Sequence, residues 1–213
     1  MKQRHFLRAV LFSAALIPCA VQATPQTITF GPDGSSFFTT DRLEVSYLNP
    51  YTGEDSHYGR QGNLLDTGYW SVAEATSNSW VAYSPRAYSP SSFSSSSGEL
   101  FNLDSFWLAG AWGSQTLTIT GYANGSVINT TTIGVDIVAQ EYFFSGFLGI
   151  DTFTIAIGND YVPNAALAPR GLGQHWTIGS VTVSAVPEPE TYAMMLAGLA
   201  MIGAVARRRR KTP

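Results

Sequence analysis

Apolar and polar residues alternate along the middle of the chain, in short stretches separated by glycine, asparagine, serine and proline. This period of two is typical of half-buried β-strands, because successive side chains of a strand point to opposite faces of the sheet. Their spacing of about ten residues indicates a sandwich or barrel of antiparallel strands, and we predict an all-β antiparallel sandwich of about eight or nine strands. The predicted strands are Thr27–Phe30, Leu43–Tyr47, Trp80–Tyr83, Leu100–Leu108, Thr116–Tyr122, Ser126–Ile133, Glu141–Phe147, Thr152–Ile157 and Trp176–Ser184.

The sharpest local signal is a hairpin at Asn124-Gly125. This dipeptide lies between TLTITGYA and SVINTTTI, and it readily adopts positive φ at both central positions of a two-residue turn. In the first arm the residues at positions 117, 119 and 121 share one face of the strand. The residues on the opposite face are Thr116, Thr118 and Thr120.

Two stretches break this alternation. Residues 49–68 contain four glycines among mixed charges, and residues 84–98 are rich in serine with two prolines. Turn-forming residues at this density predict two long surface loops. The sequence has no internal repeat, and residues 24–186 are expected to form one domain.

The first 23 residues have the order of a secretory signal peptide. Met1–Arg8 is basic, Ala9–Ile17 is a short apolar run, and small residues precede the expected cleavage between Ala23 and Thr24. The nine residues of this run rise only about 13 Å as a helix, which is too short for a bilayer core of about 30 Å. A buried N-terminal helix is the alternative.

The single cysteine, Cys19, lies inside this segment. Cleavage after Ala23 would leave a mature protein without a thiol, which excludes a disulfide framework, a cysteine nucleophile and a cysteine metal site. Lipidation is a rival interpretation, because Leu16-Ile17-Pro18-Cys19 loosely resembles a bacterial lipobox. Pro18 directly before the cysteine departs from that pattern.

The C-terminal segment, residues 187–213, has three parts. Pro187-Glu188-Pro189 predicts a short extended stalk, since its prolines continue neither a helix nor a ladder. Thr191–Ala206 is an apolar run of 16 residues, about 24 Å as a helix, and predicts one short transmembrane helix. By the positive-inside rule the basic tail, residues 207–211, places this end in the cytoplasm and the body on the far side. The tail consists of Arg207, Arg208, Arg209, Arg210 and Lys211.

This tripartite order closely resembles the PEP-CTERM sorting signal of Gram-negative bacteria that make extracellular polysaccharide. The resemblance covers about 26 residues. It implies that a membrane-embedded exosortase recognises Pro187-Glu188-Pro189, cuts near it and releases or transfers the protein to the cell exterior. The implied route is export through the inner membrane, transient attachment there, and a final location at the cell surface or outside. The activity of the body does not follow from this resemblance.

Residues 24–186 are acidic. They contain four arginines and no lysine against 13 acidic residues, a formal charge of −9 (4 − 13). A surface of this sign repels phosphate backbones, which excludes nucleic acid as a partner. The same residues include 21 serines and 18 threonines. This hydroxyl density suits a hydrated sugar matrix, and it is also common in exported β-proteins.

The reactive side chains form no recognisable catalytic motif. The mature body keeps His57 and His175, without a His-x-x-x-His pair, a Gly-x-Ser-x-Gly elbow or a phosphate-binding glycine loop. We therefore predict no catalytic residue, no metal ligand and no cofactor. His57 is expected to be solvated, and His175 to be a partly buried hydrogen-bonding residue. Calcium favours loop oxygens such as those of Asp33-Gly34, Glu54-Asp55 and Asn159-Asp160, for which simple solvation is the default.

Tryptophan offers a second line of inference, because its ring stacks on sugar rings. The predicted carbohydrate contacts are Trp112, Trp107 and Trp176. Trp112 is the best candidate for exposure, since its neighbours in Gly110-Ala111-Trp112-Gly113 give little steric cover. Trp107 alternates with Phe106, so only one of the two can face the core. The alternative is that these rings fill the core.

A second resemblance covers roughly residues 98–184. The runs GELFNLDSFWLAGAW, TLTITGYANGSVI, FLGIDTFTIAI and QHWTIGSVTVS are similar in order and spacing to jelly-roll ectodomains of PEP-CTERM proteins, which look like carbohydrate-binding or discoidin-like modules. Such modules usually carry an acidic residue in the last strand. Here Gly179 and Ser180 follow Ile178, which departs from that pattern and argues against a calcium or ligand role for this strand.

Three functions remain open. The favoured one is a non-enzymatic surface or matrix protein that contacts exopolysaccharide. The first alternative is a secreted hydrolase acting on polysaccharide, which needs two carboxylates at a fixed separation or a Ser-His pair. The second is an ice-binding protein, for which the threonine row at positions 116, 118 and 120 would have to be repeated on neighbouring strands.

Overall fold

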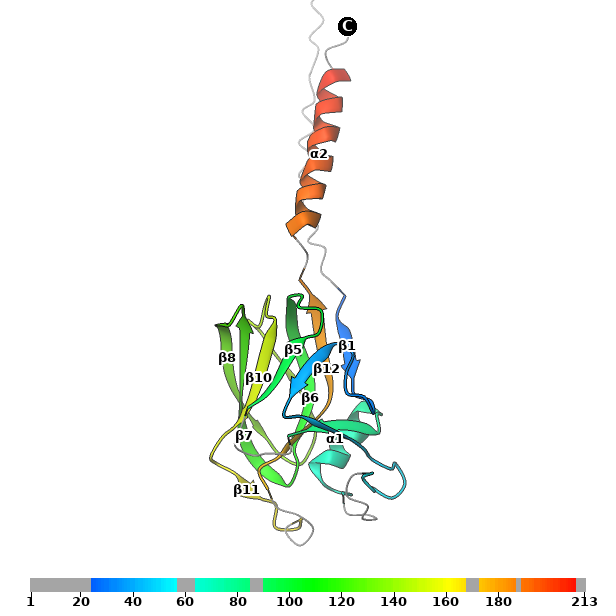
Figure 1. The fold of residues 1–213 in the computed structure, drawn as a ribbon, viewed down its shortest axis with the longest axis vertical. Helices are drawn as coiled ribbons and strands as arrows, with labels where there is room; N and C mark the ends of the chain where they lie inside the picture. Colours follow the sequence, from blue (N-terminus) through cyan, green and yellow to red (C-terminus); the bar gives the residue numbers. More distant parts are fainter. Residues whose placement is uncertain (1–23, 57–63, 85–89, 168–172, 187–188, 210–213) are drawn as a thin grey trace, which may run out of the picture.

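The computed structural model describes residues 24–56, 64–84, 90–167, 173–186 and 189–209. Two six-stranded antiparallel sheets pack face to face, with two helices outside them (Figure 1). Several predictions concern residues outside the described ranges, and the structure says nothing of them. These are the signal peptide with Cys19 and Ala23, and His57, Pro187, Glu188 and Arg210.

We name the two sheets by their central strands. The β12 sheet has the order β3 (Glu44–Tyr47), β4 (Trp80–Tyr83), β12 (Trp176–Ala185), β6 (Phe101–Gly110) and β9 (Gln140–Phe143), and β1 (Gln26–Thr29) also pairs with β12. The β7 sheet has the order β11 (Val162–Pro163), β7 (Gly113–Ala123), β10 (Thr152–Ile157), β5 (Ser91–Ser95) and β2 (Phe38–Asp41), and β8 (Ser126–Val135) also pairs with β7. The expectation of an all-β antiparallel sandwich is confirmed.

The main core lies between the sheets and is rich in phenylalanine. Phe93 of β5 stacks on Phe153 of β10 with ring centroids 4.5 Å apart, and Phe38 of β2 lies edge-on to both rings. On β7 the predicted alternation is present, with Leu117 and Ile119 buried and the threonines between them turned outward. Each fully buried ring of this kind contributes about 1.5–3 kcal/mol, so the rings hold the two sheets together.

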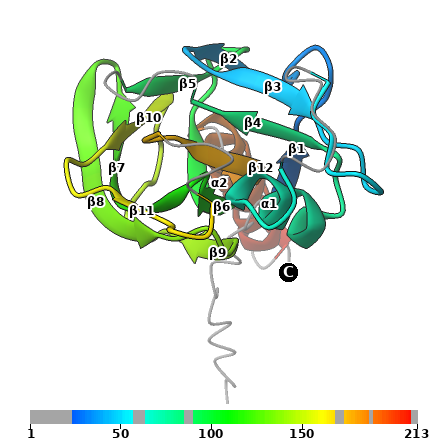
Figure 2. The same cartoon turned by 90° about the horizontal axis from the view of Figure 1, so that it is seen from below.

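Helix α1 (Gly68–Thr76) covers the outer face of the β12 sheet and encloses a second, smaller core (Figure 2). Thr67 caps its start by accepting a hydrogen bond from the Trp70 backbone, and Ser77 ends it in the left-handed conformation. The helix lies close to the sheet because Gly68 has no side chain. A Cβ there would lie 1.9 Å from the carbonyl oxygen of Gly110.

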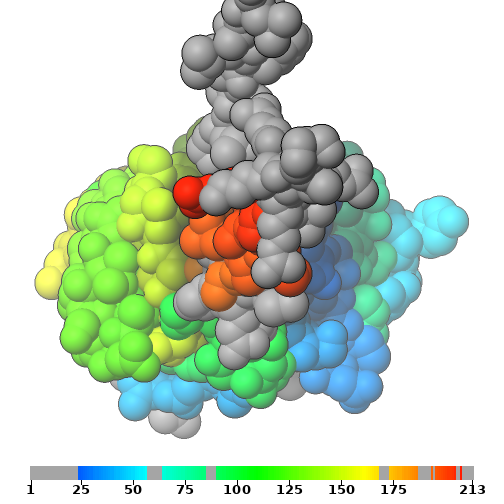
Figure 3. Space-filling view, turned by 90° about the horizontal axis from the view of Figure 1, so that it is seen from above, coloured from blue at the N-terminus to red at the C-terminus, as the bar shows by residue number. Residues whose placement is uncertain are grey.

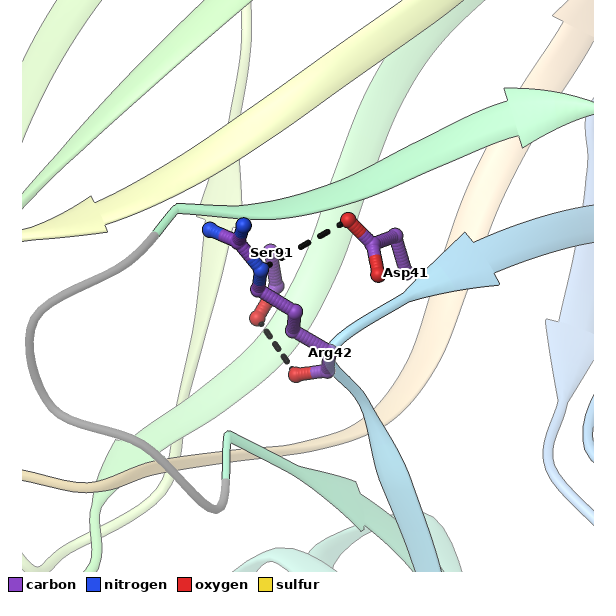
Figure 4. Close-up of polar contacts among 3 residues, drawn as sticks. All are labelled: Asp41, Arg42 and Ser91. Carbon is purple, nitrogen blue, oxygen red and sulfur yellow. Dashed lines mark hydrogen bonds and ion pairs between the residues drawn. The ribbon is translucent and has the colours of Figure 1, made fainter.

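The connection from β2 to β3 passes from one sheet to the other at Arg42. Its φ of 58° turns the chain, and the hydroxyl of Ser91 donates a 2.9 Å hydrogen bond to the Arg42 carbonyl (Figure 4). The Arg42 side chain also lies 3.6 Å from a carboxylate oxygen of Asp41. Because both of these side chains are exposed, the ion pair contributes little to stability, and the buried Ser91 hydroxyl is the firmer link.

Helix α2 (Pro189–Arg209) follows β12 and stands apart from the sheets along the long axis of the molecule (Figure 1). Figure 3 views the molecule from this end, with α2 in orange and red in front of the body. The prediction of a transmembrane helix over residues 191–206 is not supported. In the ranges that the structure describes, no helix is both long enough and apolar enough to cross a bilayer. Glu190 and Arg207 bound the apolar stretch inside the helix, which leaves fewer than the about 20 apolar residues that a span requires.

Most predicted strands occur at or near their expected residues. Trp80–Tyr83 and Thr152–Ile157 match β4 and β10 at both ends, whereas Glu141–Phe147 shortens to β9, which ends at Phe143. The hairpin at Asn124-Gly125 is confirmed, with φ of 50° and 75° at its two residues.

The prediction that residues 84–98 form a loop is wrong in part, because they contain β5. Four of its five residues are serines, which are weak strand formers, and its one apolar residue is Phe93. Pairing with β10 on one side and β2 on the other decides the conformation here. Strands β2 and β11 and helix α1 were also not predicted from the pattern.

Candidate functional site

The prediction that Trp112 is exposed is wrong. Only 9% of its surface is accessible, and its ring lies edge-on to Tyr69 of α1, with centroids 5.9 Å apart. Helix α1 supplies the cover that the glycine-rich neighbours of Trp112 do not. In this arrangement Trp112 belongs to the second core and offers no ring face to a sugar.

Trp176 and Trp107 lie on β12 and β6. Trp176 is fully buried between the sheets, 6.3 Å from the Phe93 ring centroid, and therefore also offers no face to a ligand. Trp107 is half-buried, and Phe106 beside it lies in the main core, as the alternation predicted. The three tryptophans are not brought together, and a carbohydrate role for Trp107 stays a prediction.

Trp70 of α1, which was not among the predicted contacts, is placed differently. Its ring is half-buried against the second core. Among the described residues no hydrogen-bond partner is present for its indole N–H. Glu74, one turn further along the helix, has an exposed side chain. No sequence pattern singles out Trp70, because α1 has only a weak helical signal.

Two hollows lie on either side of the Trp70–Glu74 pair, which lines both of them. The first has a volume of about 290 Å³ and the second about 260 Å³, near the lower limit for small-molecule sites. The first is otherwise lined by Leu48, Pro50, Ala73, Ser77, Asn78 and Ser79. The second is otherwise lined by Asp66, Thr67, Ser71, Ile137 and Val138.

A third hollow of about 300 Å³ lies between β8 and β9. It is lined by Thr130, Ser145 and neighbouring residues, together with Phe143, whose side chain is 77% exposed. Phe143 ends the edge strand β9.

The outer face of the β7 sheet carries a continuous set of hydroxyl groups. One row of hydroxyls runs over four neighbouring strands, from Thr130 through Thr120 and Thr154 to Ser92. It ends at Asp41 on a fifth strand, β2. A second row contains Thr152, Ser94 and Thr39. We call this surface the hydroxyl face. Its members are Thr116, Thr118, Thr120, Thr130, Thr132, Thr152, Thr154, Ser92, Ser94 and Thr39.

Hydroxyls on this face hydrogen-bond to one another across strands. The Thr118 and Thr132 oxygens lie 3.3 Å apart, and those of Ser94 and Thr152 lie 3.1 Å apart. Asp41 at the end of β2 adds a carboxylate at one margin. The face is therefore polar and almost uncharged, with both donors and acceptors along its rows.

Titratable groups elsewhere serve the fold. The predicted hydrogen bonding of His175 is confirmed, since its Nδ1 lies 2.7 Å from the Ser84 carbonyl oxygen. Two hydrogen bonds from Thr116, from its backbone N–H and its hydroxyl, hold the pKa of Asp160 below its usual range. Burial, with the nearby Asp136 charge, raises the pKa of Tyr142.

Two of the carboxylates considered for calcium have other partners. Asp55 is buried and accepts a hydrogen bond from the Ser46 hydroxyl, and Asp160 is held by Thr116. Within the described ranges no group of three or more His, Cys, Asp or Glu side chains is placed to hold a metal ion.

The C-terminal segment continues from β12 into α2. Pro189 is the first residue of α2, Arg207 is exposed, and Arg208 and Arg209 complete the helix. Residues 185–211 match the family model described as the PEP-CTERM protein-sorting motif. The chain carries a PEP-CTERM sorting signal. This signal implies export, processing by an exosortase, and a cell-surface or extracellular location.

The body has distant structural neighbours. The Agl-KA catalytic domain aligns with a TM-score of 0.40 and 10% identity, over 78% of this chain and 29% of that chain. TmCBM61, solved in complex with β-1,4-galactotriose, aligns with a TM-score of 0.31 and 12% identity, over 72% of this chain and 90% of that chain. The chain thus spans less than a third of the first of these proteins. None of the curated proteins matches it. Scores this low carry no functional argument, and the PEP-CTERM signal remains the informative match.

Proposed function

We propose that this is an exported, non-enzymatic surface or extracellular-matrix protein whose body contacts exopolysaccharide after its PEP-CTERM segment has been processed. The observation that carries the proposal is the hydroxyl face on a body that the sorting signal sends outside the cell. Rows of threonine and serine over five strands match a partner that itself consists of hydroxyl groups, because each group can donate and accept.

The charge of the body narrows the class of polysaccharide. Residues 24–186 have a formal charge of −9, and the hydroxyl face itself contains neither lysine nor arginine. An anionic polymer would be repelled by such a body. A neutral polysaccharide meets no electrostatic cost, and it is the expected partner.

The test is retention of the exported protein by polysaccharide. Full-length protein would be purified and run through native gels containing the producing organism's own exopolysaccharide, a neutral glucan or polygalacturonate. We expect retardation by the organism's own exopolysaccharide and by the neutral glucan. The combined Thr118→Val and Thr132→Val substitution should reduce it. Equal mobility in every gel would overturn the contact with polysaccharide.

One observation favours the alternative of a secreted hydrolase. Asp66 and Glu74 line the same hollow, and a glycosidase requires a pair of carboxyl groups. Both side chains are exposed, however, whereas a general acid depends on a carboxyl group withdrawn from water. Release of reducing ends that is abolished by Glu74→Gln would establish the hydrolase and overturn the non-enzymatic proposal.

The hydroxyl face also meets the condition stated for ice binding, since its threonine row is repeated on neighbouring strands. Sheets of this kind twist by about 20° or more from strand to strand, which works against matching a flat crystal plane. Inhibition of ice recrystallisation at micromolar protein would favour this function.

A further inference from the structure

We propose that the Trp70–Glu74 pair of α1 is the central ridge of a binding site for a neutral sugar chain. The Trp70 ring would serve as the stacking platform, and the hollows on either side would hold the adjoining sugar residues. This inference rests on the proposed contact with polysaccharide. It adds a second site, on the β12 sheet and away from the hydroxyl face, and it names the ligand class of that site.

The placement of Trp70 differs from that of a purely structural tryptophan. The ring is anchored against the second core, which fixes its orientation, while part of its surface remains open. By contrast, the half-buried Trp80 at the start of β4 packs against the main core and is paired with Tyr47 at a centroid distance of 5.2 Å. The ring is fixed and partly open, and its indole N–H has no partner among the described residues. Such a ring is suited to stacking and to one hydrogen bond at its edge.

The linings of the hollows match the two-sided chemistry of a sugar ring, whose faces present C–H groups and whose rim presents hydroxyls. In the first hollow Leu48, Pro50 and Ala73 supply apolar surface, and Ser77 and Asn78 supply polar groups.

The second hollow repeats this arrangement. Ile137 and Val138 supply apolar surface, and Ser71 and Asp66 supply polar groups. Since Trp70 and Glu74 belong to both hollows, a ligand that fills them must cross the ridge, as an extended chain does.

Charge selects among sugar chains. Glu74 lines both hollows and Asp66 lines the second, and no arginine, lysine or histidine is among the described residues that line either one. Carboxylates accept hydrogen bonds from pairs of hydroxyls, whereas they repel uronate, sulfate and phosphate groups. The site therefore fits a neutral polysaccharide.

The site is also accessible when the C-terminal segment is attached. Helix α1 lies near the end of the body away from α2, as Figures 1 and 2 both show. A protein tethered or processed through α2 therefore keeps the ridge free for a chain in the surrounding matrix.

The experiment is titration of the full-length protein, followed by tryptophan fluorescence and calorimetry. The probes are cellohexaose, xylohexaose and β-1,4-galactohexaose as neutral chains, and polygalacturonate oligomers as the anionic control. We expect at least one neutral chain to bind with a change in fluorescence. Trp70→Ala should weaken that binding more than tenfold. Trp70→Phe should retain it within about fivefold, because phenylalanine keeps an aromatic face on which a sugar ring can stack.

Two further variants distinguish a loss of binding from a loss of the folded state. Glu74→Gln changes an exposed side chain, so it should keep the fold and weaken binding about three- to tenfold. Phe143→Ala removes an exposed aromatic ring beside a different hollow and should leave affinity unchanged. Circular dichroism and thermal unfolding would confirm that each variant is folded.

The outcomes separate this inference from the proposed function. Unchanged binding in folded Trp70→Ala or in Glu74→Gln would overturn the ridge, while the contact with polysaccharide would stand. Binding of polygalacturonate in preference to every neutral chain would overturn the ligand class. Failure of the wild-type protein to bind any probe, together with unaltered mobility in polysaccharide gels, would overturn both.

Discussion

Trp112 and Tyr69 meet edge to face, with ring centroids 5.9 Å apart and ring planes at 70°. The contact joins the turn after β6 to helix α1, and it explains why a tryptophan among glycines is nevertheless buried. Edge-to-face pairs of this kind contribute about 0.5–1.5 kcal/mol beyond the area that they bury.

We therefore expect Trp112→Ala to lower the free energy of unfolding by about 3–5 kcal/mol, the usual cost of removing a large buried ring. Urea denaturation would measure it. The control is Phe143→Ala, which removes an exposed ring and should cost less than about 1 kcal/mol. A Trp112→Ala protein as stable as the wild type would show that the ring is not part of the second core.

Gly68→Ala should destabilise the protein by about 2 kcal/mol or more, although alanine is the better helix former. The added Cβ would lie 1.9 Å from the Gly110 carbonyl oxygen, which belongs to backbone and cannot rotate away. Gly134→Ala is the matched control, because a Cβ there meets nothing within 4 Å. Thermal unfolding of both variants tests the prediction, and equal losses would contradict the close packing of α1.

On the hydroxyl face, Thr118→Val with Thr132→Val should change stability by less than about 1 kcal/mol. The hydrogen bond between these hydroxyls is exposed and 3.3 Å long, so water replaces it readily, and valine is a good strand former. The same double substitution should lower retention by neutral polysaccharide. Chemical denaturation and native gels containing the polymer measure the two effects, and a large loss of stability would assign the face a structural role.

Stability should depend on Asp160 in acid. Its pKa is lowered from the ordinary 3.8 by the Thr116 backbone N–H and hydroxyl. Because the folded value lies below the unfolded one, the stabilisation is complete above the unfolded pKa and is lost as the pH falls through the folded pKa. Asp160→Asn should thus be less stable than the wild type at pH 7. The difference in free energy of unfolding between the two proteins should narrow below about pH 4.

Melting temperatures from pH 7 to pH 2.5 would show this narrowing. Asp33→Asn removes the same charge from an exposed turn and serves as the control. If the difference in melting temperature between Asp160→Asn and the wild type stays constant over this range, the assigned hydrogen bonds are contradicted.

The sorting signal predicts a processed C-terminus. Intact-mass measurement of protein recovered outside the cell should find chains without Arg207–Lys211, and substitution of Glu188 by alanine should leave the full-length chain associated with cells. Recovery of extracellular wild-type protein that retains Arg207–Lys211 would rule out processing.

Local sequence was sufficient where one chemical cause decided the structure. Asn124-Gly125 tolerates positive φ at both positions, so the hairpin could be placed to the residue. The alternation in β7 separates buried Leu117 and Ile119 from outward threonines, which follows from the pleat alone. The sorting signal was also readable, because it is recognised as a linear segment.

Local patterns in the chain were thus enough to predict most strands, an antiparallel sandwich, the acidic and hydroxyl-rich character of the body and the sorting signal at its C-terminus. The packing of α1 buries Trp112 and leaves Trp70 partly open, so the exposure of these two rings does not follow from their neighbours in the sequence. Only strand pairing aligned threonines from distant segments into one hydroxyl face, and only pairing turned the serines around Phe93 into a strand. Exposure and register are properties of contacts between segments far apart in the chain, so no local pattern contains them.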